Sequence, residues 1–231
     1  MIRRVQKIDD LVRVKAAMIT VSDKTGLDIL VPGLIEINPN IGIFTTGGTF
    51  EAIKKMVTPA QLDRNIIEVS TYTGQPESEG GLVKTLNHKL FLGYLTETYC
   101  EAHQNDLVRE AAVEIDLLVC NLYPFKEVVE KPGIDLEDAR GNIDVGGPSA
   151  LRACAKNFLR VMAVPDSAYY ADVLDDLRNH SGSTCLNKRF ELATETFRIL
   201  GQYDTDIYQY LRNIHLNFGL AHDIYNIHYE S

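Results

Sequence analysis

Residues 143–157, which read IDVGGPSALRACAKN, bring together groups that could move a proton beside a developing negative charge. Asp144 precedes a glycine pair at 146–147, and glycine lets the backbone approach a ligand closely. Pro148 fits the first turn of a helix whose free N–H groups form an anion site, and Lys156 lies near its end. This combination predicts general acid–base chemistry, although a purely structural turn and helix would show the same spacing.

Four other segments place polar residues and glycines after predicted strands. Runs of apolar residues predict these strands at 16–21, 41–45, 66–69 and 116–121. Because ligands bind at the carboxyl ends of parallel strands, we expect the segments to line one rim of a sheet. Their polar residues are Ser22, Asp23 and Lys24 after the first strand, Thr46, Gly47, Gly48 and Thr49 after the second, Lys84 and Thr85 in the long loop after the third, and Cys120, Asn121 and Tyr123 at the end of the fourth.

Two of these segments point to an anionic ligand. Residues 46–49 open a predicted helix, and their hydroxyl groups and glycine N–H groups suit a phosphate; plain helix capping is the alternative interpretation. Lys24 is expected in the first turn of another helix, where the helix dipole disfavours a cation. An anion bound between that lysine and the helix would remove the conflict.

The order of the elements predicts an α/β fold. Helices are expected at 25–37, 48–56, 86–99 and 105–113, between the strands. Such alternation is typical of a mostly parallel sheet with helices on both faces. From about Asp166 the chain becomes helical, at 167–179 and 187–212, which predicts an additional C-terminal helical layer.

Composition limits the classes of function. The chain has 231 residues, 45% hydrophobic and 24% charged, as in an ordinary soluble globular protein, and the length suits one large domain or one domain with a smaller appendage. A net charge of −9 argues against nucleic-acid binding, because no basic surplus can neutralise phosphates. No apolar run is long enough for a membrane span, and four cysteines without a CxxC pair fit a cytoplasmic protein. The irregularly spaced histidines of the tail do not predict a metal site.

Five motifs in sequence order carry a resemblance to a known family. They are SDKTG, TGGT, GGLVKTL, CNLYPF and IDVGGPSALRACAKN. Together they resemble the IMP cyclohydrolase domain of the bifunctional purine-biosynthesis enzyme that joins this domain to an AICAR transformylase. The resemblance covers about residues 16–212, so we expect a domain at 1–212, with its C-terminal helices from about 166, and an extension at 213–231. It implies a stand-alone cyclohydrolase with a fold similar to methylglyoxal synthase.

The resemblance also implies a reaction and a site. The carboxamide nitrogen of 5-formamidoimidazole-4-carboxamide ribotide (formyl-AICAR) attacks the formyl carbon, and water leaves to give IMP, with no cofactor or metal. By position, Lys156 is the expected proton donor to the formyl oxygen and Asp144 the group that orients or deprotonates the carboxamide. Lys84 and Tyr123 complete the expected catalytic set. The expected nucleotide-binding residues are Ser22, Asp23, Lys24, Thr46, Gly47, Gly48, Thr49, Thr85, Cys120, Asn121, Val145, Gly146 and Gly147.

The chain departs from the family pattern at one informative place. The family usually reads GGRVKTLHP, whereas this chain has Leu82 in place of the arginine and Asn87 and His88 at the end. A non-catalytic nucleotide-binding regulatory module on the same fold is therefore the alternative to the enzyme, and a methylglyoxal synthase-like lyase is a third. The resemblance implies a homodimer, and a separate enzyme that formylates AICAR.

Overall fold

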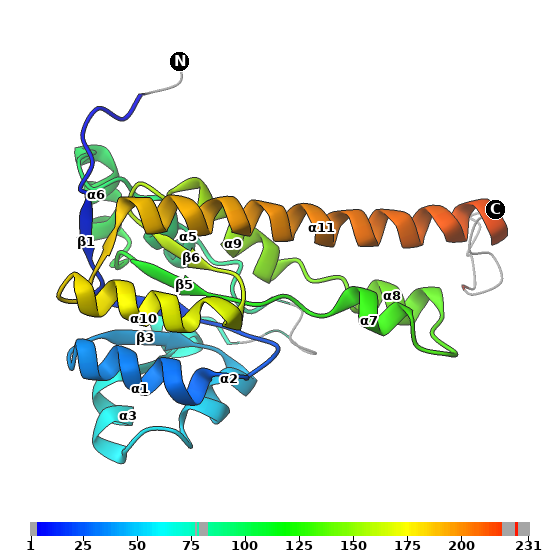
Figure 1. Ribbon diagram of the computed structural model, residues 1–231, viewed down its shortest axis with the longest axis horizontal. Helices are drawn as coiled ribbons and strands as arrows, with labels where there is room; N and C mark the ends of the chain where they lie inside the picture. The colour runs from blue at the N-terminus through cyan, green and yellow to red at the C-terminus, as the bar shows by residue number, and fades with distance from the viewer. Residues whose placement is uncertain (1–3, 77, 79–82, 219–224, 226–231) are drawn as a thin grey trace.

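The centre of the molecule is a five-stranded parallel sheet. The computed structural model describes residues 4–76, 78, 83–218 and 225. The strands lie side by side in the order β4 (Ile66–Glu68), β3 (Gly42–Thr45), β2 (Ala16–Ile19), β5 (Leu117–Val119) and β6 (Met162–Val164) (Figure 1). Met18 is paired with Phe44 on one side and Leu118 on the other. The strands are apolar throughout because both faces of the sheet are covered.

Helices cover both faces of the sheet, as predicted. On one face lie α1 (Leu27–Ile37) and α10 (Tyr170–Asn179), whose leucines share a buried cluster with Ile19 and Val119. On the other face lie α5 (His88–Leu95) and α9 (Gly146–Lys156), which share a second cluster with Met18 and Leu118. The alternation of Ile19 and Met18 between the two clusters follows from the two-residue period of a strand. The predicted α/β fold is confirmed.

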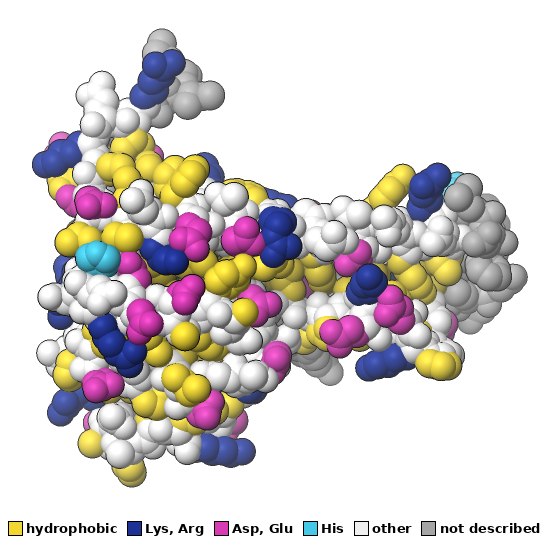
Figure 2. Space-filling view, viewed as in Figure 1, with side chains coloured by type: hydrophobic (Ala, Val, Ile, Leu, Met, Phe, Trp, Pro, Cys, Tyr) yellow, Lys and Arg dark blue, Asp and Glu magenta, His cyan; other side chains and the backbone are white. Residues whose placement is uncertain are grey.

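One long helix closes the fold. Helix α11 (Leu186–Phe218) packs along the edge strand β6 and against α9, and then projects beyond the sheet (Figure 1). It begins one residue before the predicted start at 187 and runs past residue 212 to Phe218, so the expected domain boundary is not a break in secondary structure. Its projecting half packs against α7 (Phe125–Val129) and α8 (Leu136–Gly141), and hydrophobic side chains lie along this seam (Figure 2).

Several elements differ from the sequence-based expectation. Helix α1 begins two residues later than the predicted 25–37; it continues through Pro32, and its buried leucines on both sides of the proline hold it against the core. The pattern also missed several short elements, whose few residues show no clear period. The remaining helices and strands are β1 (Leu11–Arg13), which pairs antiparallel with β7 (Ser183–Cys185), α2 (Gly47–Ile53), α3 (Pro59–Asn65), α4 (Val69–Thr73), α6 (Glu101–Arg109) and the 3₁₀ turn η2 (Ser167–Tyr169). None of the described helices is long and apolar enough to cross a bilayer.

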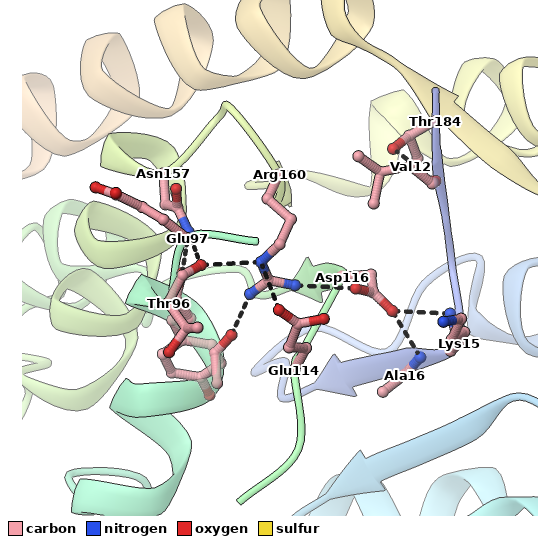
Figure 3. Close-up of polar contacts among 12 residues, drawn as sticks. Val12, Lys15, Ala16, Thr96, Glu97, Glu114, Asp116, Asn157, Arg160 and Thr184 are labelled. Atoms are coloured by element: carbon pink, nitrogen blue, oxygen red, sulfur yellow. Dashed lines mark hydrogen bonds and ion pairs between the residues drawn. The ribbon is translucent and has the colours of Figure 1, made fainter. Parts of the chain in front are cut away.

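A buried ion pair ties the amino ends of the central strands to the helical layer. Asp116, just before β5, accepts hydrogen bonds from the backbone N–H groups of Lys15 (2.8 Å) and Ala16 (3.1 Å), which lead into β2. The guanidinium of Arg160 donates to Asp116 at 2.9 Å and to the carbonyls of Gly93, in the last turn of α5, and Thr96, just after it (Figure 3). Burial raises the pKa of Asp116, and the charge of Arg160 opposes that rise.

Removal of the cation from this pair should be costly. We expect Arg160→Met to lower the free energy of unfolding by about 3–5 kcal/mol, because the buried carboxylate of Asp116 would lose its counter-charge. The matched control is Arg178→Met, whose ion pair with Asp175 is exposed and should contribute about 1 kcal/mol or less. Urea denaturation measures both. Equal effects of the two substitutions would contradict a structural role for the buried pair.

Candidate active site

A cleft lies at the carboxyl ends of β2, β3 and β5, on the opposite edge from the Asp116–Arg160 pair. We call it the rim cleft; its volume is about 440 Å³, within the range of small-molecule sites. Its position matches the point where the strand order reverses, between β2 and β5, which is where open α/β sheets bind ligands. The lining residues are Thr20, Val21, Ser22, Lys24, Thr46, Gly48, Thr49, Val83, Lys84, Thr85, Leu86, Cys120, Asn121, Tyr123, Gly141, Ile143, Asp144, Val145, Gly146 and Gly147.

The predicted residues are brought together with three exceptions. Asp23 faces a neighbouring groove, and its carboxylate accepts hydrogen bonds from the N–H (2.9 Å) and hydroxyl (2.7 Å) of Thr25. Gly47 adjoins the cleft in the left-handed region, at φ 38°, without lining it. Lys156 is exposed at the carboxyl end of α9, whereas Gly146 at the amino end lines the cleft. Lys156 does not line this cleft in the single chain, because eleven helical residues separate the two ends of α9 by about 15 Å. Its role as proton donor stays a prediction.

Asp144 is held at the amino end of α9. Its Oδ1 accepts a hydrogen bond from the backbone N–H of Gly147 at 3.1 Å. Burial raises the pKa of the Asp144 carboxyl, and the N–H groups of Gly147, Gly146 and Tyr123 oppose that rise. A half-buried carboxylate of raised pKa is a better proton acceptor than a solvated one, and hydrogen bonds from backbone N–H groups favour its ionised form.

The two glycines at 146–147 allow close packing around this carboxylate. A Cβ on Gly147 would lie 2.4 Å from Oδ2 of Asp144, closer than any real contact. A Cβ on Gly146 would lie 2.9 Å from the hydroxyl oxygen of Thr85. A larger residue at either position would displace one of these cleft side chains, so the close approach favours glycine here; neither glycine has a positive φ.

Asn121 joins two rim loops. Its Oδ1 accepts from the N–H of Ser22 (2.6 Å), the hydroxyl of Ser22 (2.9 Å) and the N–H of Asp23 (3.1 Å), while its Nδ2 donates to the carbonyl of Asp23 (2.8 Å). The hydroxyl of Ser22 also reaches the carbonyl of Leu122 at 2.8 Å. These bonds use the amide of Asn121 to hold the two rim loops together, a structural role that accompanies its predicted place beside a base.

Lys24 points into the end of β2. Helix α1 begins at Leu27, after Gly26 at φ 77°, so Lys24 precedes the helix and the expected first-turn conflict does not exist. Its ammonium donates to the carbonyl of Val21 and, at 3.0 Å, to that of Ser22. Burial lowers the pKa of Lys24. The lysine is thus a half-buried cation of the rim cleft, still suited to an anionic ligand.

The hydroxyls of the second loop have different tasks. Thr49 is buried, and its hydroxyl accepts from the N–H of Val21 (3.2 Å) and donates to the carbonyl of Val21 (3.1 Å). It therefore holds α2 against the end of β2. The hydroxyl of Thr46 lies 3.3 Å from that of Thr20, a cleft residue that the sequence analysis did not identify. Thr46 makes no side-chain cap to α2.

The third loop reaches the cleft through Lys84 and Thr85. Thr85 is buried beside Gly146, and Lys84 is exposed at the mouth of the cleft. Leu82, which stands in place of the family arginine, lies outside the described residues, as do the histidines at 222 and 228 of the tail. Two groups of possible metal ligands among the described residues, Glu97–Cys100–His103 and Asp176–His180–Cys185, include no residue of the rim cleft.

The comparison with protein families agrees with this architecture. The model of the MGS-like domain matches residues 30–149, more than half of the chain. The chain belongs to the MGS-like domain family. The model of the AICARFT/IMPCHase bienzyme matches residues 154–230, which include β6 and α11. The resemblance predicted from the five motifs is thereby confirmed.

Individual relatives extend over most of the chain. The bifunctional purine biosynthesis protein PurH of Ruminiclostridium cellulolyticum is 40% identical over 201 residues, which are 87% of this chain and 37% of PurH. PurH of Listeria monocytogenes is 40% identical over 200 residues, 87% of this chain and 38% of PurH. The chain thus spans little more than a third of these relatives. The crystal structure of ForH is similar at 29% identity and a TM-score of 0.72, over 86% of this chain and 99% of ForH.

The close contact at the family motif gives a test of the site's packing. We expect Gly147→Ala to lower the free energy of unfolding by about 1–3 kcal/mol, because the added methyl group must displace the Asp144 carboxylate. Gly201→Ala is the control, because it adds the same methyl group inside α11 with no atom within 4 Å, and should be neutral or stabilising by up to about 1 kcal/mol. Thermal unfolding of both variants decides. A Gly147→Ala protein as stable as Gly201→Ala would contradict the described position of Asp144.

Proposed function

We propose that this MGS-like protein is an IMP cyclohydrolase, which closes the ring of formyl-AICAR to give IMP and water. The observation that carries the proposal is the half-buried carboxylate of Asp144, bound by the first N–H groups of α9 inside the rim cleft. The identity of 40% with the purine-biosynthesis protein PurH supports the choice of substrate. A methylglyoxal synthase-like lyase would be supported by the fold alone, and a fold by itself does not select a reaction.

In the proposed reaction Asp144 is the base. The carboxamide nitrogen attacks the formyl carbon, a C–N bond forms, and the nitrogen's proton passes to the Asp144 carboxylate. The formyl oxygen gains negative charge and takes up one proton to form a carbinol. A second protonation lets it leave as water, while the former formamide nitrogen loses its proton and the ring C=N bond forms. Lys84 and Tyr123, which line the same cleft, are the proposed donors to that oxygen in place of Lys156. The reacting groups belong to one molecule, so correct positioning supplies much of the rate.

The nucleotide phosphate has a proposed place at the end of β2 and β3. Lys24 supplies a half-buried positive charge there, and Thr46 and Gly48 line the adjacent wall. Phosphate is a favourable partner for a lysine and for the backbone N–H groups at the start of α2. The heterocycle would then extend towards Asp144 and the start of α9.

The direct test is conversion of formyl-AICAR to IMP by the purified protein, followed by ultraviolet absorbance. Turnover that depends on enzyme concentration supports the cyclohydrolase. Calorimetric binding of IMP without turnover supports the alternative, a nucleotide-binding regulatory module, for which the loss of the family arginine at Leu82 is the specific argument. A protein that neither turns over formyl-AICAR nor binds IMP would refute both the cyclohydrolase and the regulatory module.

Asp144→Asn separates catalysis from folding. The amide still accepts a hydrogen bond from Gly147 but cannot take a proton, so kcat should fall by about 10²-fold or more. Burial raises the pKa of Asp144, so the native state binds that proton more tightly, and stability falls as pH rises through the interval between the ordinary and raised pKa. At neutral pH the asparagine variant should therefore unfold at the same or a higher temperature. Loss of both activity and stability would contradict this assignment.

The wild-type pH profile follows from the same carboxyl group. Because the base must be ionised, kcat/KM should fall with decreasing pH around a pKa above the ordinary aspartate value of about 3.9.

The proposed reaction also needs a supply of formyl-AICAR from a separate formylating enzyme. The proposed homodimer is tested by light scattering after size-exclusion chromatography.

A further inference from the structure

We propose that Tyr203, on α11, is a positioning residue for Asp144: its hydroxyl holds the backbone of Asp144 so that the carboxylate faces the rim cleft. This inference rests on the proposed function. It assigns a role to α11, the C-terminal helix, which lies outside the five sequence motifs. Tyr203 lies 59 residues from Asp144 in the sequence.

The contact is direct. The backbone N–H of Asp144 donates to the Tyr203 hydroxyl oxygen at 2.8 Å. Asp144 precedes Val145, the N-cap residue of α9, so its own N–H cannot be satisfied by the helix. The Asp144 carboxylate bonds to the N–H of Gly147 in the first turn. The hydroxyl of Tyr203 thus fixes the backbone of the residue from the side of α11, while α9 fixes its carboxylate.

The ring of Tyr203 is itself immobilised. Its residue is 8% exposed, in a small cluster with Phe125 and Ala139. The Phe125 ring meets it edge-on, with centroids 6.3 Å apart and an interplanar angle of 73°. Packed aromatic rings have few alternative rotamers, so the hydroxyl is presented at a fixed point. Leu122 and Ile143, which flank the rim loops, pack against the same cluster.

The helices on either side of this contact are also joined. Arg152 of α9 pairs with Asp204 of α11 at 3.2 Å, one residue from Tyr203. That pair is half-exposed on both sides and contributes about 1 kcal/mol at most. The hydrogen bond between the Asp144 N–H and the Tyr203 hydroxyl is therefore the better defined link between α11 and the loop that carries Asp144. A displacement of about 1 Å at a reacting group can cost about 10²-fold in rate, so this link has consequences for turnover.

The test compares Tyr203→Phe with Tyr210→Phe. Tyr210 lies two turns further along α11, in contact with the same Phe125, and its hydroxyl donates to the carbonyl of Asp135 at 3.3 Å without contacting Asp144. Both substitutions remove one hydroxyl from one aromatic cluster. Amide hydrogen exchange of a peptide that spans 143–147, the thermal midpoint, and kcat and KM for formyl-AICAR are measured on each full-length variant.

Tyr203→Phe should accelerate exchange in 143–147 and lower kcat by about tenfold or more, with KM within about twofold of wild type. Tyr210→Phe should leave exchange and kcat unchanged at a similar thermal midpoint. Unchanged exchange in Tyr203→Phe, or equal losses of kcat in both variants, would overturn the proposal. If the wild type itself does not turn over formyl-AICAR, the proposed function fails, and the exchange comparison alone decides whether Tyr203 holds Asp144.

Discussion

The parallel direction of the five strands is the constraint on which the rest of the molecule depends. Because every strand points the same way, each loop that leaves a carboxyl end arrives at one edge of the sheet. Segments as distant in sequence as Ser22 and Asp144 therefore share one cleft. The opposite edge receives the amino ends, and there Asp116 and Arg160 satisfy the backbone that leads into β2 and the carbonyls beside α5.

Each end of the sheet holds a buried or half-buried carboxylate, and the two carboxylates have different hydrogen-bond partners. Asp116 has a buried arginine at 2.9 Å and two backbone donors, which compensate for its desolvation and tie four segments together. Asp144 accepts hydrogen bonds from backbone donors at the start of α9, and burial raises its pKa as it raises that of Asp116. A carboxylate held this way stabilises the fold less than a paired one, but it retains affinity for a proton. The first arrangement serves structure and the second suits proton transfer.

The C-terminal helix joins these functions. The first half of α11 packs on β6 and α9 as part of the core, and Arg189 near its start is fully buried, donating to backbone carbonyls of Phe158 (3.0 Å) and Asp10 (3.0 Å). Further along, Tyr203 reaches the loop that carries Asp144. The helix therefore both anchors the amino-terminal segment and contacts the site. This agrees with the two family matches: the bienzyme model covers residues 154–230, which include α11, and the MGS-like model covers residues 30–149, which include Asp144.

The sequence by itself determined the class of fold and most of the rim. Apolar runs such as 116–121 and the glycine pair at 146–147 identify strands and turns through local rules, and parallel topology then predicts one shared edge. Only the tertiary structure decided which polar groups line the rim cleft and which are hydrogen-bonded within the protein. Thr49 and Asn121 are committed to backbone partners far away in the sequence, Lys156 is separated from the cleft by the length of α9, and Tyr203 reaches Asp144 from another helix. The physical reason is that a side chain's hydrogen-bond partner and direction depend on contacts between distant segments, which no local pattern of residues contains.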